Sequence, residues 1–252
     1  QKMVDKYLNS SAYGERWARH WMDLVRYAET KGHEFDFTIT GAWKYRDYLI
    51  RAFNNDVPYN QILKEHLAGD LLENKRYDTK NGVLESPIAT NFYTLGEGAH
   101  SPVDIRQDEA NRIDNMIDVI TKGFQGLTVS CAKCHDHKFD PIEQADYYAL
   151  AGVFRSTATM ANTDHVSRWV ERVLPHPDNS GRRARFDAKK EALESAILAL
   201  KSAAVSEQTK KDLKQLQSEL NALSETGAGL PQAMAVQDGE IQDLPVHFRG
   251  NH

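Results

Sequence analysis

Cys131, Cys134 and His135 are the residues whose types and spacing most clearly predict a chemistry. They form the sequence C-x-x-C-H, which is the spacing of covalent c-type haem attachment. Two thiols three residues apart can each add to a vinyl group of the porphyrin, and the next side chain can bind the iron through one ring nitrogen. The other ring N–H then needs an acceptor that fixes the imidazole. The motif therefore predicts haem c with His135 as an axial iron ligand.

The same five residues are compatible with three alternatives to haem. A structural zinc site could use both cysteines with His135 or His137, but the second pair of ligands that such sites use is missing downstream at motif spacing. A thioredoxin-like redox pair would follow a strand, whereas a helical pattern leads into this motif. Five-residue motifs also occur by chance. These two residues are the only cysteines of the chain, so the sequence offers no disulfide framework.

The elements that must position the motif are two predicted helices. Apolar residues from Asp108 to Leu127 recur on one helical face and lead directly into the cysteines. After the motif, Asp140 can cap a helix, Pro141 fits its first position and Glu143 can complete the cap. We expect that helix to continue through Phe154, so the motif lies between two helices.

Further helices are predicted before and after this pair. Residues 11–29 place Trp17, Trp21, Leu24 and Ala28 on one helical face. Two more helices are expected over residues 42–53 and from residues 56–58 to a stop at Gly69, followed by a long loop over residues 72–102.

Residues 180–226 are rich in Ala, Leu, Lys, Glu and Gln, with leucines at the a and d spacing of a coiled coil. They predict an antiparallel helical hairpin with arms of about 20 Å, rather than a dimerising coiled coil.

The pattern as a whole predicts a mostly α fold, with an irregular helical haem-binding domain, an inserted antiparallel helical hairpin and a short strand-like C-terminal segment. The predicted domains are a helical cytochrome c-like haem domain (1–170), the hairpin (180–226) and the start of a following, truncated domain (227–252). The chain begins at Gln1 without a signal segment, so we expect a processed product or a piece of something longer.

Composition excludes several classes of protein. The 31 basic and 36 acidic side chains give a formal charge of −5, which argues against a nucleic-acid binder held by phosphate contacts. The longest strictly apolar run, residues 196–200, is far shorter than the roughly 18 residues that cross a bilayer. We therefore expect no transmembrane segment in this chain.

Five stretches of the chain resemble a known family, the planctomycete-type cytochrome c domain of large exported proteins. The matching stretches are residues 13–28, 42–54, 66–72, 112–118 and 126–142. The resemblance implies that Cys131 and Cys134 hold haem c and that His135 is the proximal ligand. It also implies that residues 246–250 open the partner domain that normally follows. Haem attachment outside the cytoplasm predicts an exported location, periplasmic or at the cell surface, with a redox protein or another domain of the same polypeptide as partner.

The sixth iron ligand is left open by the sequence. Met160 is a candidate because a thioether would raise the potential, although a gap-filling core methionine is the simpler interpretation. His20 is another, more simply explained as a hydrogen-bonded core histidine. His33 and His100 lie in loops with carboxylates that would suit a second site. His137 follows His135 too closely to reach the opposite haem face, and we expect it to hold a propionate, a backbone carbonyl or water.

Three arginines, Arg26, Arg46 and Arg51, could pair with haem propionates, or could form ordinary surface salt bridges. The function predicted from all of this is one-electron transfer through a single covalent haem. Two alternatives remain. One is a haem-dependent oxidoreductase acting on a small or saccharide-like molecule, with His33, Glu34, Glu97 and His100 holding the substrate. The other is a haem-free interaction or zinc module.

Overall fold

The structure is a computed structural model that describes residues 1–30, 32, 36, 38–80, 82–96, 102–162, 168–174, 179–202, 207–225 and 232–251. It is mostly helical, as the sequence predicts. The α-helices are α1 (Lys2–Leu8), α2 (Ala12–Leu24), α3 (Trp43–Asn54), α4 (Tyr59–Ala68), α5 (Ser86–Ala89), α6 (Ile105–Ile120), α7 (Gln144–Arg155), α8 (Asn179–Ser202) and α9 (Glu207–Glu225). Shorter helical turns are η1 (Thr90–Thr94), the π-turn η2 (Thr121–Gln125), and the 3₁₀ helices η3 (Val129–Lys133) and η5 (Phe248–Gly250).

The strands of the described chain are all two or three residues long. They are β1 (Tyr77–Asp78), β2 (Val83–Leu84), β3 (Thr157–Ala158), β4 (Met160–Asn162), β5 (Arg168–Trp169), β6 (Glu171–Val173), β7 (Gln232–Met234) and β8 (Gln237–Asp238). The antiparallel pairs β3–β8 and β4–β5 belong to the same compact unit as the helices α1 to α7. Strands β7 and β8 thus form in the region where the sequence predicts a strand-like C-terminal segment.

The chain forms two compact units. The first contains Gln1–Tyr77, Glu85–Arg172 and Ala233–His252, and the second contains Asp78–Leu84 and Val173–Gln232. Within this chain, the residues from 233 onward therefore pack with the helical unit that carries the motif. Whether residues 227–252 also open a following domain stays a prediction. No helix of the described residues is both long enough and apolar enough to cross a membrane.

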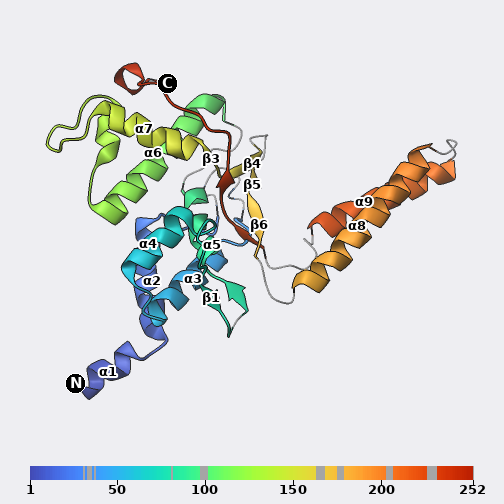
Figure 1. Ribbon diagram of the computed structural model, residues 1–252, viewed down its shortest axis with the longest axis horizontal. Coiled ribbons are helices and arrows are strands. Elements are labelled where there is room, and N and C mark those ends of the chain that lie inside the picture. The colour runs from blue at the N-terminus through green and yellow to red at the C-terminus, as the bar shows by residue number, and fades with distance from the viewer. Residues whose placement is uncertain are drawn as a thin grey trace. The chain divides into compact units, whose positions relative to one another are not determined.

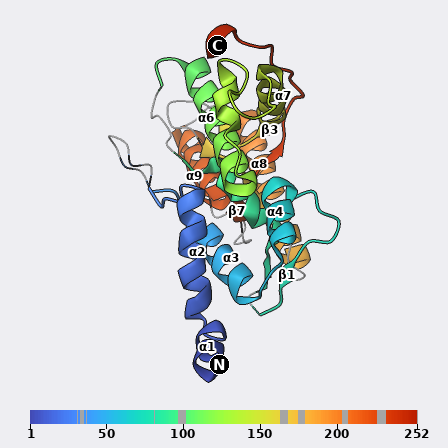
Figure 2. The same cartoon turned by 90° about the vertical axis from the view of Figure 1, so that its left-hand side faces the viewer.

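Helices α2 and α3 lie side by side in the first unit (Figure 2). Gly14 allows this close approach, because a Cβ atom at Gly14 would lie 2.4 Å from the carbonyl oxygen of Ile50. The buried residues of α2 are Gly14, Ala18 and Trp21. The predicted face of residues 17, 21, 24 and 28 is therefore wrong except at Trp21, since Trp17 and Leu24 are 48% and 52% exposed.

An aromatic cluster around His66 fills the centre of this unit. The His66 ring lies within 6 Å of the rings of Trp21, Tyr45, Phe92 and Phe124. Phe124 belongs to η2, immediately before the motif, so the cluster joins the N-terminal helices to the segment that leads into the cysteines.

Two buried carboxylates join the helices around this cluster. Glu85, fully buried, is paired with Arg51 of α3, and Glu65, also fully buried, is paired with Arg76 at 2.9 Å. Tyr48 donates a further hydrogen bond of 2.7 Å to Glu65. Because each buried charge has an opposite charge beside it, these groups can remain ionised inside the unit.

The predicted loop over residues 72–102 is wrong in its middle. There α5 and η1 form one buried run of two short helices, in which Ile88, Ala89 and Phe92 are no more than 1% exposed. Nine residues are too few to show a helical period, and the flanking Gly and Asn residues conceal the apolar segment.

The predicted hairpin is present as α8 and α9, which pack against each other (Figure 1). Leu193 and Ile197 are the buried residues of α8, at 8% and 6% exposure. The helices contain 24 and 19 residues, so they are about 36 Å and 28 Å long at 1.5 Å per residue. Both are longer than the expected arms of about 20 Å.

Candidate haem-attachment site

The C-x-x-C-H motif lies on the short 3₁₀ helix η3 and the residues that follow it. Cys131 lies inside η3 and Cys134 ends it. A 3₁₀ helix has three residues per turn, so side chains three positions apart lie on the same side. Both cysteines are exposed and free, while Val129 and Ala132 of the same turn are buried. The local fold thus anchors the turn by its apolar residues and leaves both thiols accessible.

The imidazole of His135 is exposed and oriented by the backbone. Its Nδ1 atom lies 2.7 Å from the carbonyl oxygen of Asp136. A carbonyl oxygen can only accept a hydrogen bond, so this contact assigns the proton to Nδ1 and the lone pair to Nε2. An imidazole in this state binds a metal through Nε2, with its other nitrogen held by an acceptor.

The first turn of α7 holds the motif from the other side. The carbonyl oxygen of Lys133 accepts hydrogen bonds from Gln144 Nε2 at 2.9 Å and from the Tyr148 hydroxyl at 3.1 Å. The backbone N–H of Gln144 donates to Asp136 Oδ1 at 2.8 Å. The residues before Cys134 and after His135 are therefore both fixed to the same helix.

Helix α7 begins three residues later than predicted, because His137 organises the chain before it. Glu143 caps the helix in a reciprocal arrangement with Asp146. Nδ1 of His137 accepts from the backbone N–H of Asp140 at 2.9 Å, and Nε2 lies 2.8 Å from the Thr128 hydroxyl. The expectation that His137 holds a propionate, a carbonyl or water is wrong, since both ring nitrogens bind groups of the protein.

The side chain of Asp140 also lies close to the His137 ring. It places a carboxylate oxygen 3.3 Å from Nδ1, which would be an ion pair if that nitrogen carried a proton. A nitrogen that accepts a backbone N–H has no proton to donate. With Nδ1 held by the Asp140 backbone and Nε2 beside the Thr128 hydroxyl, His137 braces the loop.

The C-terminal segment reaches the motif, which the sequence does not indicate. Gly250 has a φ of +73°, and a Cβ atom there would lie 2.8 Å from the sulfur of Cys134. The backbone carbonyl oxygen of His247 accepts a hydrogen bond from Gln144 Nε2 at 3.2 Å. The imidazole ring of His247 lies 5.0 Å from the ring of Tyr148. Gln144 and Tyr148 could have been found from the sequence because they lie in the first two turns of the helix after the motif, but the approach of Gly250 leaves no local signal.

Among the described residues, no contact joins Met160 or His20, two of the candidates for the sixth ligand, to the motif. Met160 lies in β4, beyond the end of α7 opposite to Gln144. The 12 residues of α7 separate the two ends by about 18 Å. His20 is exposed on α2 with its ring packed against Trp17, so the expectation of a hydrogen-bonded core histidine is wrong. His33 and His100 lie outside the described residues, as do Glu34 and Glu97.

The three arginines differ in their partners. Arg46 pairs with Glu29 and Asp47, and Arg51 pairs with buried Glu85. The three guanidinium nitrogens of Arg26 are buried and have no hydrogen-bond partner within the described part of the chain. Burial lowers the pKa of Arg26 to about 10, an effect that the nearby Asp118 partly offsets.

Arg26 lies close to Asp118 of α6. Asp118 pairs with Lys122 at 2.7 Å, and Lys122 is near enough to Cys131 for their charges to interact. A buried guanidinium without a partner is well suited to accept a carboxylate. The residues of the motif itself therefore fit a haem, with two exposed thiols and one oriented imidazole.

Zinc coordination requires a different set of ligands. Closed zinc sites use four Cys, His or carboxylate side chains. Over the ranges that the structure describes, no group of three or more His, Cys, Asp or Glu residues is placed to hold one metal ion.

Comparisons with known proteins place the chain in a family without assigning its activity. The family model described as PSCyt2, protein of unknown function (DUF1549), matches residues 1–159. No curated protein and no solved structure matches the chain. The matched region contains the motif and its flanking helices and ends before Met160 and the hairpin. Because the match covers more than half of the 252 residues, the chain belongs to the PSCyt2 family.

Proposed function

We propose that this chain is a c-type cytochrome domain that transfers single electrons through one haem attached to Cys131 and Cys134. The observation that carries the proposal is the arrangement of two accessible thiols on one 3₁₀ turn, followed by an imidazole whose Nδ1–H is already bound by the Asp136 carbonyl. That arrangement meets the geometric needs of covalent attachment and axial ligation together.

Each residue of the site has a defined part in this proposal. Each thiol would add across a vinyl group, with the sulfur bonding to one carbon and the thiol hydrogen passing to the other, so attachment needs no oxidant. His135 would bind the iron through Nε2. Gln144 and Tyr148, through the Lys133 carbonyl, would keep that side chain at a fixed angle. The bound haem would supply a one-electron redox couple whose potential depends on ligands, burial and hydrogen bonds.

The surroundings of the motif suit contact with another redox group. Phe139 and Phe248 are 82% and 80% exposed, and both lie within a few residues of groups that contact the motif. Apolar side chains around a redox centre exclude water from a protein contact. We propose a redox protein or another domain of the same polypeptide as the partner, and an exported location, because thioether attachment takes place outside the bacterial cytoplasm.

Mass spectrometry of the protein purified from a host that attaches haem c outside its cytoplasm tests the proposal. We expect a covalent mass increment of one haem, which is lost in the double variant Cys131→Ala, Cys134→Ala. Ser130→Ala, on the same turn, is the matched control and should keep the increment. Unmodified thiols and no bound iron in the wild-type protein from that host would refute the assignment.

A haem-dependent oxidoreductase is the second candidate function. It requires an axial position that a substrate can reach. Met160 lies beyond the end of α7 that is far from the motif, so it is not placed to fill that axial position. The visible spectrum separates the two. A six-coordinate low-spin haem that ignores cyanide supports electron transfer, whereas a high-spin haem that binds cyanide supports catalysis.

A further inference from the structure

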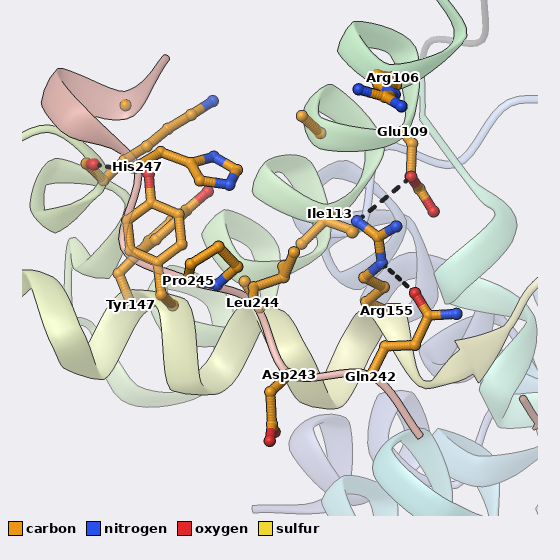
Figure 3. A pocket seen from close by; sticks show the side chains of 15 residues that line it. Arg106, Glu109, Ile113, Tyr147, Arg155, Gln242, Asp243, Leu244, Pro245 and His247 are labelled. Atoms are coloured by element: carbon orange, nitrogen blue, oxygen red, sulfur yellow. Dashed lines mark hydrogen bonds and ion pairs between the residues drawn. The ribbon is translucent and has the colours of Figure 1, made fainter. Parts of the chain in front are cut away.

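A cavity of about 480 Å³ lies between α6, α7 and the C-terminal segment (Figure 3). Its volume is within the range of small-molecule sites. Lys133 and Gly250, which lie beside Cys134, line it, and Figure 3 shows His247 on the opposite side from Arg155 and Glu109. The cavity is thus a neighbour of the attachment site, although none of the three motif residues lines it.

The wall of this α6–α7 cavity is partly apolar and is held in place. Ile113, Ala151, Leu244 and Pro245 supply apolar surface. The segment that carries Leu244 and Pro245 is tied at both ends, by Gln144 to the His247 carbonyl and by Arg155 to Gln242. The cavity is therefore preformed, with little ordering left for a ligand to bring about.

The charges around the cavity favour an anion. Three cations line it, Arg106, Lys133 and Arg155, against the carboxylates Glu109 and Asp243. Glu109 faces Arg155 at 3.6 Å, and the Asp243 carboxylate points away from the other lining groups (Figure 3). With Asp114, which pairs with Lys133 but does not line the cavity, the nearby charges balance, so the preference for an anion depends on Arg106.

Arg106 is the cation left for a ligand. Lys133 pairs with Asp114 at 3.4 Å, and Arg155 is bound to Gln242 and Glu109. Within the ranges described, Arg106 forms no ion pair with a carboxylate of the protein. A guanidinium presents a planar fork that matches a carboxylate. The cavity therefore combines apolar wall residues with one solvent-exposed guanidinium, that of Arg106, which can bind a carboxylate.

We propose that the α6–α7 cavity binds a small organic acid, with its carboxylate at Arg106 and its apolar body between Ile113 and Leu244. Binding at this site requires no haem, so the proposal can be tested independently of the proposed electron transfer. The ring of His247 borders the cavity beside Tyr148. It would contact the ligand but would not supply the main binding interaction.

Calorimetric titration of the full chain with benzoate tests this proposal. Benzamide, which has the same ring and no charge, is the ligand control. We expect saturable benzoate binding and at least about tenfold weaker benzamide binding, since a hydrogen bond to a charged group is worth about that factor. Benzoate should also shift the His247 ring proton signal, assigned with His247→Gln, which locates the ligand in this cavity.

Two variants and one matched control complete the experiment. Arg106→Gln should weaken benzoate binding about tenfold, and Ala110→Leu, which fills the cavity, should weaken it as well. Arg19→Gln changes an exposed arginine of α2 and should bind as the wild type does. Equal binding of benzoate and benzamide, an unchanged affinity in Arg106→Gln, or no saturable binding of benzoate would each overturn the proposal.

Discussion

The buried histidine of the aromatic cluster, His66, should make the stability of the protein depend on pH. Its Nδ1–H donates to the Ile62 carbonyl at 2.7 Å. Its Nε2 lies 2.7 Å from the Tyr45 hydroxyl and 3.2 Å from Trp21 Nε1, so Nε2 accepts and the ring is neutral. Burial lowers the pKa of His66 from its ordinary value of 6.5 to about 4.

The sign and size of the effect follow from the difference between these two pKa values. Below pH 6.5 the unfolded chain takes up a proton at His66, whereas the folded chain does not do so until about pH 4. The free energy of unfolding is therefore fully retained above pH 6.5 and falls as the pH falls toward 4. Between pH 7.5 and 5 this one side chain should account for a loss of about 2 kcal/mol.

Urea unfolding at several pH values between 7.5 and 5 measures this loss. His66→Gln should be less stable at pH 7.5, but its free energy of unfolding should fall by about 2 kcal/mol less than that of the wild type over the range. His20→Gln, which changes an exposed histidine of α2, is the matched control and should keep the wild-type dependence. Parallel losses in the wild type and His66→Gln would refute the reasoning.

Three further substitutions test the packing and the buried charges by urea unfolding at pH 7.5. Gly14→Ala should cost about 1 to 3 kcal/mol, because the added Cβ meets a backbone carbonyl of α3. Gly123→Ala is its control and should be close to neutral, since a Cβ there meets nothing within 4 Å; equal losses in both would contradict the close-approach argument. Arg51→Met should cost about 3 to 5 kcal/mol, since it removes the guanidinium that pairs with the buried carboxylate of Glu85. Arg26→Met removes a buried charge that has no partner in the described chain, so the free energy of unfolding should stay the same or rise, and a large loss would show that this guanidinium is paired.

Local periodicity predicted the helices that are long enough to show it. The helices at α3, α4 and α6 and the hairpin of α8 and α9 were found in this way, and the mostly helical fold is confirmed. The buried face of α2 was predicted wrongly, because large apolar residues were assigned to the core. Close packing against α3 selects Gly14 and Ala18 instead, and it leaves Trp17 at the surface.

For the candidate site too, the sequence indicates the residues that are close together along the chain but not the tertiary contacts that orient them. The two cysteines and His135 were identified because their spacing within five residues is itself the signal. The contacts that orient them come from Gln144 and Tyr148 of the next helix and from Gly250 near the C-terminus. Hydrogen bonds and close approaches of this kind depend on tertiary packing, which a single sequence does not reveal.

The hydrogen bond from Gln144 to the His247 carbonyl has a practical consequence for expressing the protein in pieces. The boundary suggested by the family match, residue 159, would retain the cysteines and the whole of α7. It would also discard the downstream stretch that packs on Cys134 and closes one wall of the neighbouring cavity. A shortened version should therefore include residues 233–251, because without them the sulfur of Cys134 and one wall of the cavity would be more exposed to solvent than in the intact chain.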